Sequence, residues 1–211
     1  MMLFKIKKFK AQSIIDQKNL GHLNGHLSYA KYKFKEKINT KEKKFNGAGV
    51  YGIFLDDKLI YIGKFQGQKD DWNSGNVVKT RWVKHIGTFT MLDKKVSFNP
   101  TIYSKILENI KLSLNTNKNL KILHSGFLAA NKNILTRQMD CVSSFERFSI
   151  AEKIWKNNPD LENILSRFSF IYSKLDGKCE TQKIINFVSF IEDQINKKVA
   201  IKNNSKNVQY G

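Results

Sequence analysis

The stretch GVYGIFLDDKLIYIG, residues 49–63, decides the fold that the sequence predicts. Strand-forming apolar residues fill both halves of this stretch, and the pair Asp56-Asp57 stands between them. Two such runs around a short acidic turn are typical of a β-hairpin, which we expect to extend over residues 49–65. A symmetrical register about the turn would bring Tyr51 and Tyr61 close to directly opposite each other, and a β-bulge would change that register.

Helical patterns follow the predicted hairpin. Val78, Trp82 and Ile86 recur every four residues, which indicates one buried helix face, and Gly87 is the predicted end of this helix. The other predicted elements are helices over 101–116, 143–157 and 159–174, a last helix from Thr181, and a strand over 120–129. The sequence thus predicts an α+β fold in which a small antiparallel sheet of about three strands is flanked by helices.

The chain is strongly basic. Its 211 residues carry 37 Lys and Arg against 18 Asp and Glu, which is a formal charge of +19. A lysine-rich genome would raise Glu together with Lys, and Glu has not kept pace. An excess of this size attracts polyanions, because each neutralised phosphate releases condensed counterions. The composition therefore favours nucleic acid as the partner.

Two features speak against a membrane protein. No apolar run approaches the roughly 20 residues that a membrane span needs, and lysines interrupt the first residues, MMLFKIKKFKAQ, too often for a signal-peptide core. Cys141 and Cys179 are the only cysteines, and two distant cysteines do not make a disulfide framework. We expect no membrane partner and a location in the reducing cytoplasm.

Much of the positive charge lies near the N-terminus, where residues 1–48 hold 12 lysines and three acidic residues. Within it, KYKFKEK (31–37) alternates Lys with Tyr and Phe, so an extended segment would carry lysines on one face and aromatic rings on the other. The lysines of this face are Lys31, Lys33, Lys35 and Lys37. Two interpretations stay open, namely an arm that contacts the DNA backbone and an edge strand whose lysines prevent aggregation.

The helix after the hairpin carries Arg81 and His85 four residues apart, on one face. The order of GVY (49–51), YIG (61–63) and Arg-x-x-x-His resembles the GIY-YIG nuclease family. The resemblance implies a three-stranded antiparallel sheet with flanking helices. It also implies a site of two tyrosines, an arginine, a histidine and a glutamate around one divalent ion. The matching residues here are Tyr51, Tyr61, Arg81, His85 and a glutamate on a later helix.

Two glutamates compete for that role as metal ligand. Glu146 belongs to the pattern Ser143-x-x-Glu146, a capping box that already explains it. Glu152 falls between Phe148 and Trp155 on the face predicted to be buried against the sheet, where an ionisable group is costly unless it serves a site. We therefore expect Glu152 to be the metal ligand and keep Glu146 as the alternative.

Further positions fit or depart from the resemblance. Pro159 and Asn163 follow Glu152 in the order that the family shows, and Asn163 is a supporting site residue on that ground, with Asn158 as the alternative equivalent. Gly49 and Gly63 flank the tyrosines and would allow close approach to a ligand. Lys64 stands where the family often has a small hydroxyl residue, and it could lower the pKa of Tyr51 or touch phosphate. The long stretch between His85 and Glu152 is a candidate insertion.

These observations lead to one functional prediction. We expect a single domain over 1–211, with a basic arm (1–45), a catalytic core (46–165) and a C-terminal helical extension (166–211). The expected activity is metal-dependent, sequence-specific cleavage of double-stranded DNA with Mg²⁺, or alternatively Mn²⁺, by a type II restriction enzyme that acts as a homodimer. The alternatives are a homing or repair nuclease and a non-catalytic nucleic-acid-binding module on the same scaffold.

Overall fold

The computed structural model describes residues 7–20, 32–68, 71, 73–93, 96–97, 99–112, 117–130, 141–142, 144–157 and 160–174. The chain divides into two compact units, and each is described by itself. The first holds the described residues of 1–14, 37–81 and 165–211, and the second those of 15–36 and 82–164. The predicted helix from Thr181, like Lys31, lies outside the described residues. No described helix is both long and apolar enough to cross a bilayer.

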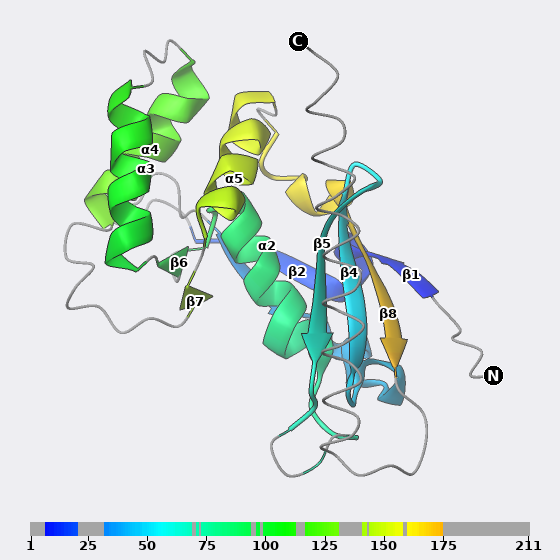
Figure 1. The fold of residues 1–211 in the computed structure, drawn as a ribbon. Helices are drawn as coiled ribbons and strands as arrows, with labels where there is room; N and C mark the ends of the chain where they lie inside the picture. Colours follow the sequence, from blue (N-terminus) through cyan, green and yellow to red (C-terminus); the bar gives the residue numbers. More distant parts are fainter. Residues whose placement is uncertain are drawn as a thin grey trace, which may run out of the picture. The chain divides into compact units, whose positions relative to one another are not determined.

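A four-stranded antiparallel sheet forms the first unit (Figure 1). Its strands are β1 (Lys7–Lys10), β4 (Gly49–Leu55), β5 (Lys58–Phe65) and β8 (Phe168–Lys174), in the spatial order β1-β8-β4-β5. The hairpin predicted over 49–65 is therefore confirmed as β4 and β5, and the α+β class holds. The sheet has four strands rather than three, because a segment from each side of the hairpin joins it.

The hairpin turn explains why the acidic pair stands there. Asp56 and Asp57 have φ values of 48° and 60°, the left-handed conformation that a two-residue hairpin turn of type I′ requires and that Asp tolerates. Arg167 donates from Nε to the Asp56 carboxylate at 2.8 Å, and Lys8 forms an ion pair with Asp57. The hydrogen bond from Arg167 lowers the pKa of Asp56. The turn is thus bound to the residues before β8 and to β1.

Two apolar runs differ from the prediction. Residues 168–174, expected to be helical, form β8, whose Phe168, Phe170 and Tyr172 are buried at a spacing of two. Residues 120–129, expected to be a strand, lie in α4 (Lys118–Ala130), where Leu120, Leu123 and Phe127 are buried at helical spacing. In short apolar runs, hydrophobicity alone does not distinguish a strand from a helix. Here the spacing of the large buried side chains distinguishes them.

Helices dominate the second unit. They are α2 (Val83–Thr90), α3 (Pro100–Leu112), α4 and α5 (Phe145–Asn157), and α5 packs against the other three. The helices predicted over 101–116 and 143–157 are confirmed as α3 and α5. A ribbon of β2 (Ile15–Asn19) and β3 (Tyr32–Glu36) and a parallel pair, β6 (Val96–Ser97) with β7 (Cys141–Val142), complete the unit.

Gly87 does not end its helix. A π-helical turn, η3 (Val78–Trp82), leads into α2, which continues to Thr90. Met91 then adopts the left-handed conformation and donates its N–H to the Gly87 carbonyl at 2.9 Å. A Cβ on Gly87 would lie 3.1 Å from the Asp93 Cβ, so Gly87 lets the chain fold back closely after the helix. The remaining short helical turns are α1 (Ala11–Ile14), η1 (Ile38–Lys41), η2 (Lys43–Phe45) and η5 (Ile164–Arg167).

Candidate functional site

The two motif tyrosines lie together in the first unit. Tyr51 of β4 is opposite Gly63 of β5, and Tyr61 is opposite Ile53. The tyrosines are therefore diagonal neighbours on one face of the sheet rather than direct partners. The register shifts by one residue at a bulge between Ile53 and Phe54, and without this shift Tyr51 would be opposite Ile62 and Tyr61 would lie on the other face. Their ring centroids are 6.1 Å apart, Tyr51 is 2% exposed, and Tyr61 is half-buried.

Gly63 is the position around which this pair is built. A Cβ there would lie 2.6 Å from both Cζ and Oη of Tyr51 and 2.7 Å from Cε1 of Tyr61. Ordinary contacts with a Cβ lie between 3.4 and 4 Å. Only a residue without a side chain allows the two rings to approach in this way, so the close approach expected at Gly63 is to the tyrosines themselves.

Gly49 has an equivalent role at the start of β4. A Cβ at Gly49 would overlap the Ser173 carbonyl oxygen and would lie 2.8 Å from Cε2 of Tyr172. The Tyr172 hydroxyl donates to the Gly47 carbonyl, and burial raises the pKa of Tyr172. The glycine therefore lets β8 pack closely against β4.

Arg81, also in the first unit, is exposed on the π-helical turn. Asn76, which sequence reasoning did not single out, holds the start of this turn. Its side-chain oxygen accepts from the Lys79 N–H at 3.0 Å, and its amide donates to the Thr40 carbonyl at 2.6 Å. Lys64 lies on β5 opposite Val50 and is half-buried.

His85 lies on α2 in the second unit and is 7% exposed. Its ring is 6.0 Å from that of Phe89, one turn further along the helix. Arg147 of α5 lies over the Phe89 ring at 5.3 Å and donates to the Thr88 hydroxyl at 3.4 Å. Arg147 is thus a cation beside the histidine-bearing helix that the sequence patterns did not reveal.

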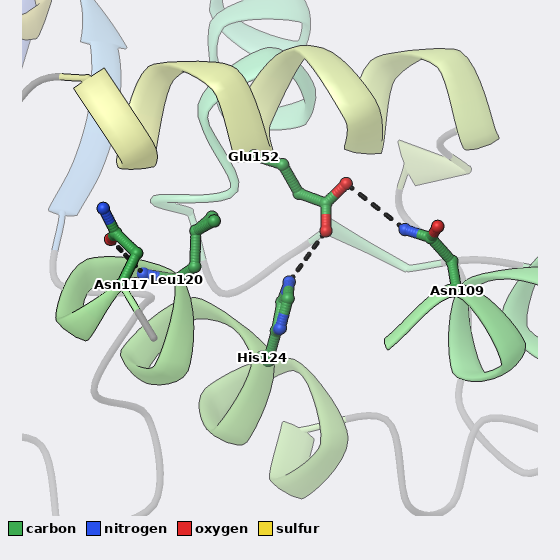
Figure 2. Close-up of polar contacts among 5 residues, drawn as sticks. All are labelled: Asn109, Asn117, Leu120, His124 and Glu152. Atoms are coloured by element: carbon green, nitrogen blue, oxygen red, sulfur yellow. Dashed lines mark hydrogen bonds and ion pairs between the residues drawn. The ribbon is translucent and has the colours of Figure 1, made fainter. Parts of the chain in front are cut away.

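Glu152 of α5 has two side-chain partners among the described residues (Figure 2). One carboxylate oxygen lies 2.7 Å from Nε2 of His124 on α4, and the other accepts from the Asn109 amide of α3 at 3.5 Å. The side chains of His124 and Glu152 are 8% and 18% exposed. In the second unit the carboxylate therefore points toward α3 and α4.

Glu146 is the exposed competitor at the start of the same helix. Ser144 caps this helix, since its Oγ accepts from the Arg147 N–H at 3.4 Å. A side-chain hydrogen bond with Ser144 also lowers the pKa of Glu146. The structural role assigned to Glu146 thus involves Ser144, whereas Ser143 lies outside the described residues.

Sequence reasoning missed His124 because it predicts a strand for this segment. In α4 it is one of the buried residues, together with Leu120, Leu123 and Phe127. A helical spacing of apolar residues with one histidine on the same stripe was the signal in the sequence. Asn117 caps this helix, accepting from the N–H groups of Asn119 and Leu120 at 3.0 and 3.2 Å, which sets the helix start and with it the histidine's direction.

Asn163 is held locally. Its amide donates to the Asp160 carboxylate at 2.7 Å, and its N–H donates to the other oxygen at 3.2 Å. These bonds lower the pKa of Asp160 and close the turn after α5.

The predicted alternation in the N-terminal segment is confirmed for β3. Tyr32 and Phe34 are buried, whereas Lys33 and Lys35 are exposed. Lys37 differs, because its ammonium group donates to the Gln12 carbonyl at 2.8 Å in the first unit. In the ribbon, Lys33 is paired with Lys18 of β2.

Glu152 is the carboxylate that the sequence predicts as the ligand of a divalent ion. Mg²⁺ is commonly held by one or two carboxylates, with phosphate oxygens and water completing its shell. Glu152 offers one partly exposed carboxylate, and Asn109 directs its amide N–H toward that carboxylate. Among the described residues no group of three or more His, Cys, Asp or Glu side chains gathers around a single point. The protein would therefore hold the ion through Glu152 and leave most of its shell to water and substrate.

The structure brings Tyr51 to Tyr61 in the first unit and Glu152 to His124 and Asn109 in the second. Comparison of the chain with protein-family models, with curated proteins and with solved structures finds no match.

Proposed function

We propose that the protein is a metal-dependent DNA endonuclease, of the type II restriction class. The observation that carries the proposal is the tyrosine pair of GVY and YIG, packed around a glycine that no other residue could replace without displacing the rings. Two tyrosines in a small sheet are common as core residues. Here the two rings also pack against the motif glycine, and an exposed arginine stands on the next helical turn.

Hydrolysis of a phosphodiester requires a proton to leave water, charge on the phosphate to be stabilised, and the leaving oxygen to be protonated. We assign proton handling to Tyr51, Tyr61 and His85, whose hydroxyl and imidazole groups can relay protons. Arg81 supplies a fork-shaped cation that matches phosphate oxygens. Glu152 holds the divalent ion, which when bound acts as a Lewis acid.

The β2–β3 ribbon supports a polyanionic partner. Lys18, Lys33 and Lys35 are exposed on it, with Lys18 directly opposite Lys33 and Asp16 opposite Lys35. Like charges that face each other across two strands are destabilising in the free protein. A phosphate group between them would remove that repulsion, so we assign this face to the DNA backbone and count Lys18 with the lysines expected from the sequence.

A mixed-sequence plasmid incubated with the protein and Mg²⁺ tests the proposal. Discrete fragments are expected for a restriction enzyme, and cutting of palindromic sites would agree with a homodimer. A smear would indicate a non-specific nuclease. Intact but retarded DNA would favour the second candidate, a binding module, which the charge of +19 and the exposed lysines alone would support.

The choice of carboxylate has its own test. Glu152→Gln keeps the shape of the side chain and removes its charge, so cleavage should fall by about 10²-fold or more while DNA affinity stays near that of the wild type. Glu146→Gln on the same helix is the matched control and should cut normally. Loss of cleavage in Glu146→Gln alone would show that the other carboxylate holds the ion.

A further inference from the structure

The helices α3 and α4 lie between His85 and Glu152, in the stretch that the sequence predicts to be an insertion. Each sends one polar side chain to Glu152, His124 from α4 and Asn109 from α3 (Figure 2). Each partner reaches a different oxygen of the carboxylate. Both oxygens of Glu152 therefore face polar groups of helices other than its own, at 2.7 Å from His124 and at the long distance of 3.5 Å from Asn109.

Aromatic packing fixes the position of His124. Its ring stacks on Phe148 of α5 at 6.2 Å with an interplanar angle of 23°. Phe127 of α4 lies 5.0 Å from Phe148 and 5.5 Å from Tyr103 of α3. These rings join α3, α4 and α5 around the pair, so the imidazole cannot turn away from Glu152 without disturbing three helices.

The Glu152 carboxylate has more acceptor positions than its two partners use. An ionised carboxylate has about four lone-pair directions, and His124 and Asn109 occupy two of them. A glutamate held at both oxygens presents the remaining directions in one orientation, whereas a free one would sample many. Ligands oriented by hydrogen bonds to neighbouring side chains bind metal more tightly than unsupported ones.

We propose that α3 and α4 act as a clamp that orients Glu152 for the divalent ion, with His124 and Asn109 as positioning residues. The proposal rests on the proposed function in that Glu152 is taken as the metal ligand. It gives α3 and α4 a role in the metal site.

Binding of Mn²⁺, followed by electron paramagnetic resonance of the free ion, tests the clamp without DNA. His124→Leu should weaken Mn²⁺ binding by about 10- to 100-fold. His124→Gln can place an amide near the position of Nε2 and should restore most of the affinity. Asn109→Leu should weaken binding less, since its hydrogen bond is longer. Asn119→Leu, the same change on α4 at a side chain with no hydrogen bond to Glu152 among the described residues, is the matched control.

Cleavage then distinguishes positioning from a general loss of structure. In His124→Leu the Mg²⁺ concentration for half-maximal cleavage should rise by a similar factor, and saturating Mg²⁺ should recover much of the rate. Circular dichroism checks that each variant folds. If His124→Leu does not fold, the Mn²⁺ affinities of His124→Gln and Glu152→Gln are compared instead. The double variant His22→Gln/His26→Gln removes two of the three other histidines of the chain and should bind Mn²⁺ normally.

The outcomes separate the two proposals. If the wild type binds Mn²⁺ and His124→Leu does not, yet no DNA is cut, the clamp stands and the nuclease function is wrong. If the wild type cuts DNA while His124→Leu and His124→Gln both bind Mn²⁺ and respond to Mg²⁺ as it does, the clamp is wrong and the nuclease stands. A wild type that binds no Mn²⁺ at Glu152 overturns the clamp whatever its activity.

Discussion

Gly63→Ala should damage the protein through a single added methyl group. The new Cβ would lie 2.6 Å from Cζ and Oη of Tyr51 and 2.7 Å from Cε1 of Tyr61, whereas ordinary contacts begin at 3.4 Å. The rings must therefore give way by about 0.8 Å, and they meet the methyl group from two sides. Gly63 is not among the glycines with positive φ, so the backbone itself accepts alanine and the clash alone decides the effect.

Overpacking of this kind costs about 1–3 kcal/mol, which corresponds to a drop in Tm of roughly 2–12 °C for a chain of this size. Urea unfolding, followed by tyrosine and tryptophan fluorescence, measures the change in free energy. If the tyrosines handle protons, a displacement of about 1 Å should also slow single-turnover cleavage by about 10²-fold.

Gly52→Ala is the matched control on the partner strand. Its Cβ would meet the side chains of Ile171 and Leu59 at 3.0–3.1 Å, and these aliphatic ends can move by a few tenths of an ångström. Tyr51→Leu should relieve the clash, so Gly63→Ala should cost less in that background than alone. If Gly63→Ala is as stable as Gly52→Ala, or if the two changes at 63 and 51 are additive, the rings do not depend on this glycine.

Three further outcomes are expected. Asp56 has a lowered pKa because Arg167 donates a hydrogen bond to it, so its contribution to stability is present above the ordinary Asp pKa and is lost as pH falls through the lowered value. The urea midpoints of Asp56→Asn and of the wild type should therefore converge as pH falls from about 5 to 2. A constant difference between the two midpoints would contradict this sign. Replacing Lys33 and Lys35 by Gln should reduce the slope of log DNA affinity against log salt concentration by about one for each phosphate that is no longer neutralised. Fluorescence anisotropy with duplex DNA measures this slope, and an unchanged slope would make β3 a protected edge strand. Tyr172→Phe removes the hydroxyl that donates to the Gly47 carbonyl and should lower the free energy of unfolding in urea by about 1–3 kcal/mol. A decrease of only a few tenths of a kcal/mol, on the order of the effect of a surface substitution, would mean that this hydrogen bond contributes little to stability.

Some of the predicted site follows from local sequence and some does not. The proximity of the two tyrosines could be predicted, because both belong to one hairpin with a short turn, whereas their diagonal register depends on the bulge between Ile53 and Phe54. The partners of Glu152 could not, since His124 is 28 residues away along the chain, and the helical spacing around it indicates a buried stripe without indicating which helix faces that stripe. The domain boundaries and the catalytic role of each residue remain predictions.

Local sequence accounts for the central hairpin of this protein. Asp56 and Asp57 tolerate the left-handed turn, and the branched residues on both sides favour strands, so the hairpin needs no distant partner to be recognised. The tertiary structure decided which other apolar runs became strands. Phe168–Lys174 is a strand because it lies between β1 and β4 and forms hydrogen bonds with both. Such pairing joins residues as distant as Lys7 and Tyr172, and no local propensity encodes it, because sheet hydrogen bonds and shared burial appear only after the chain has folded.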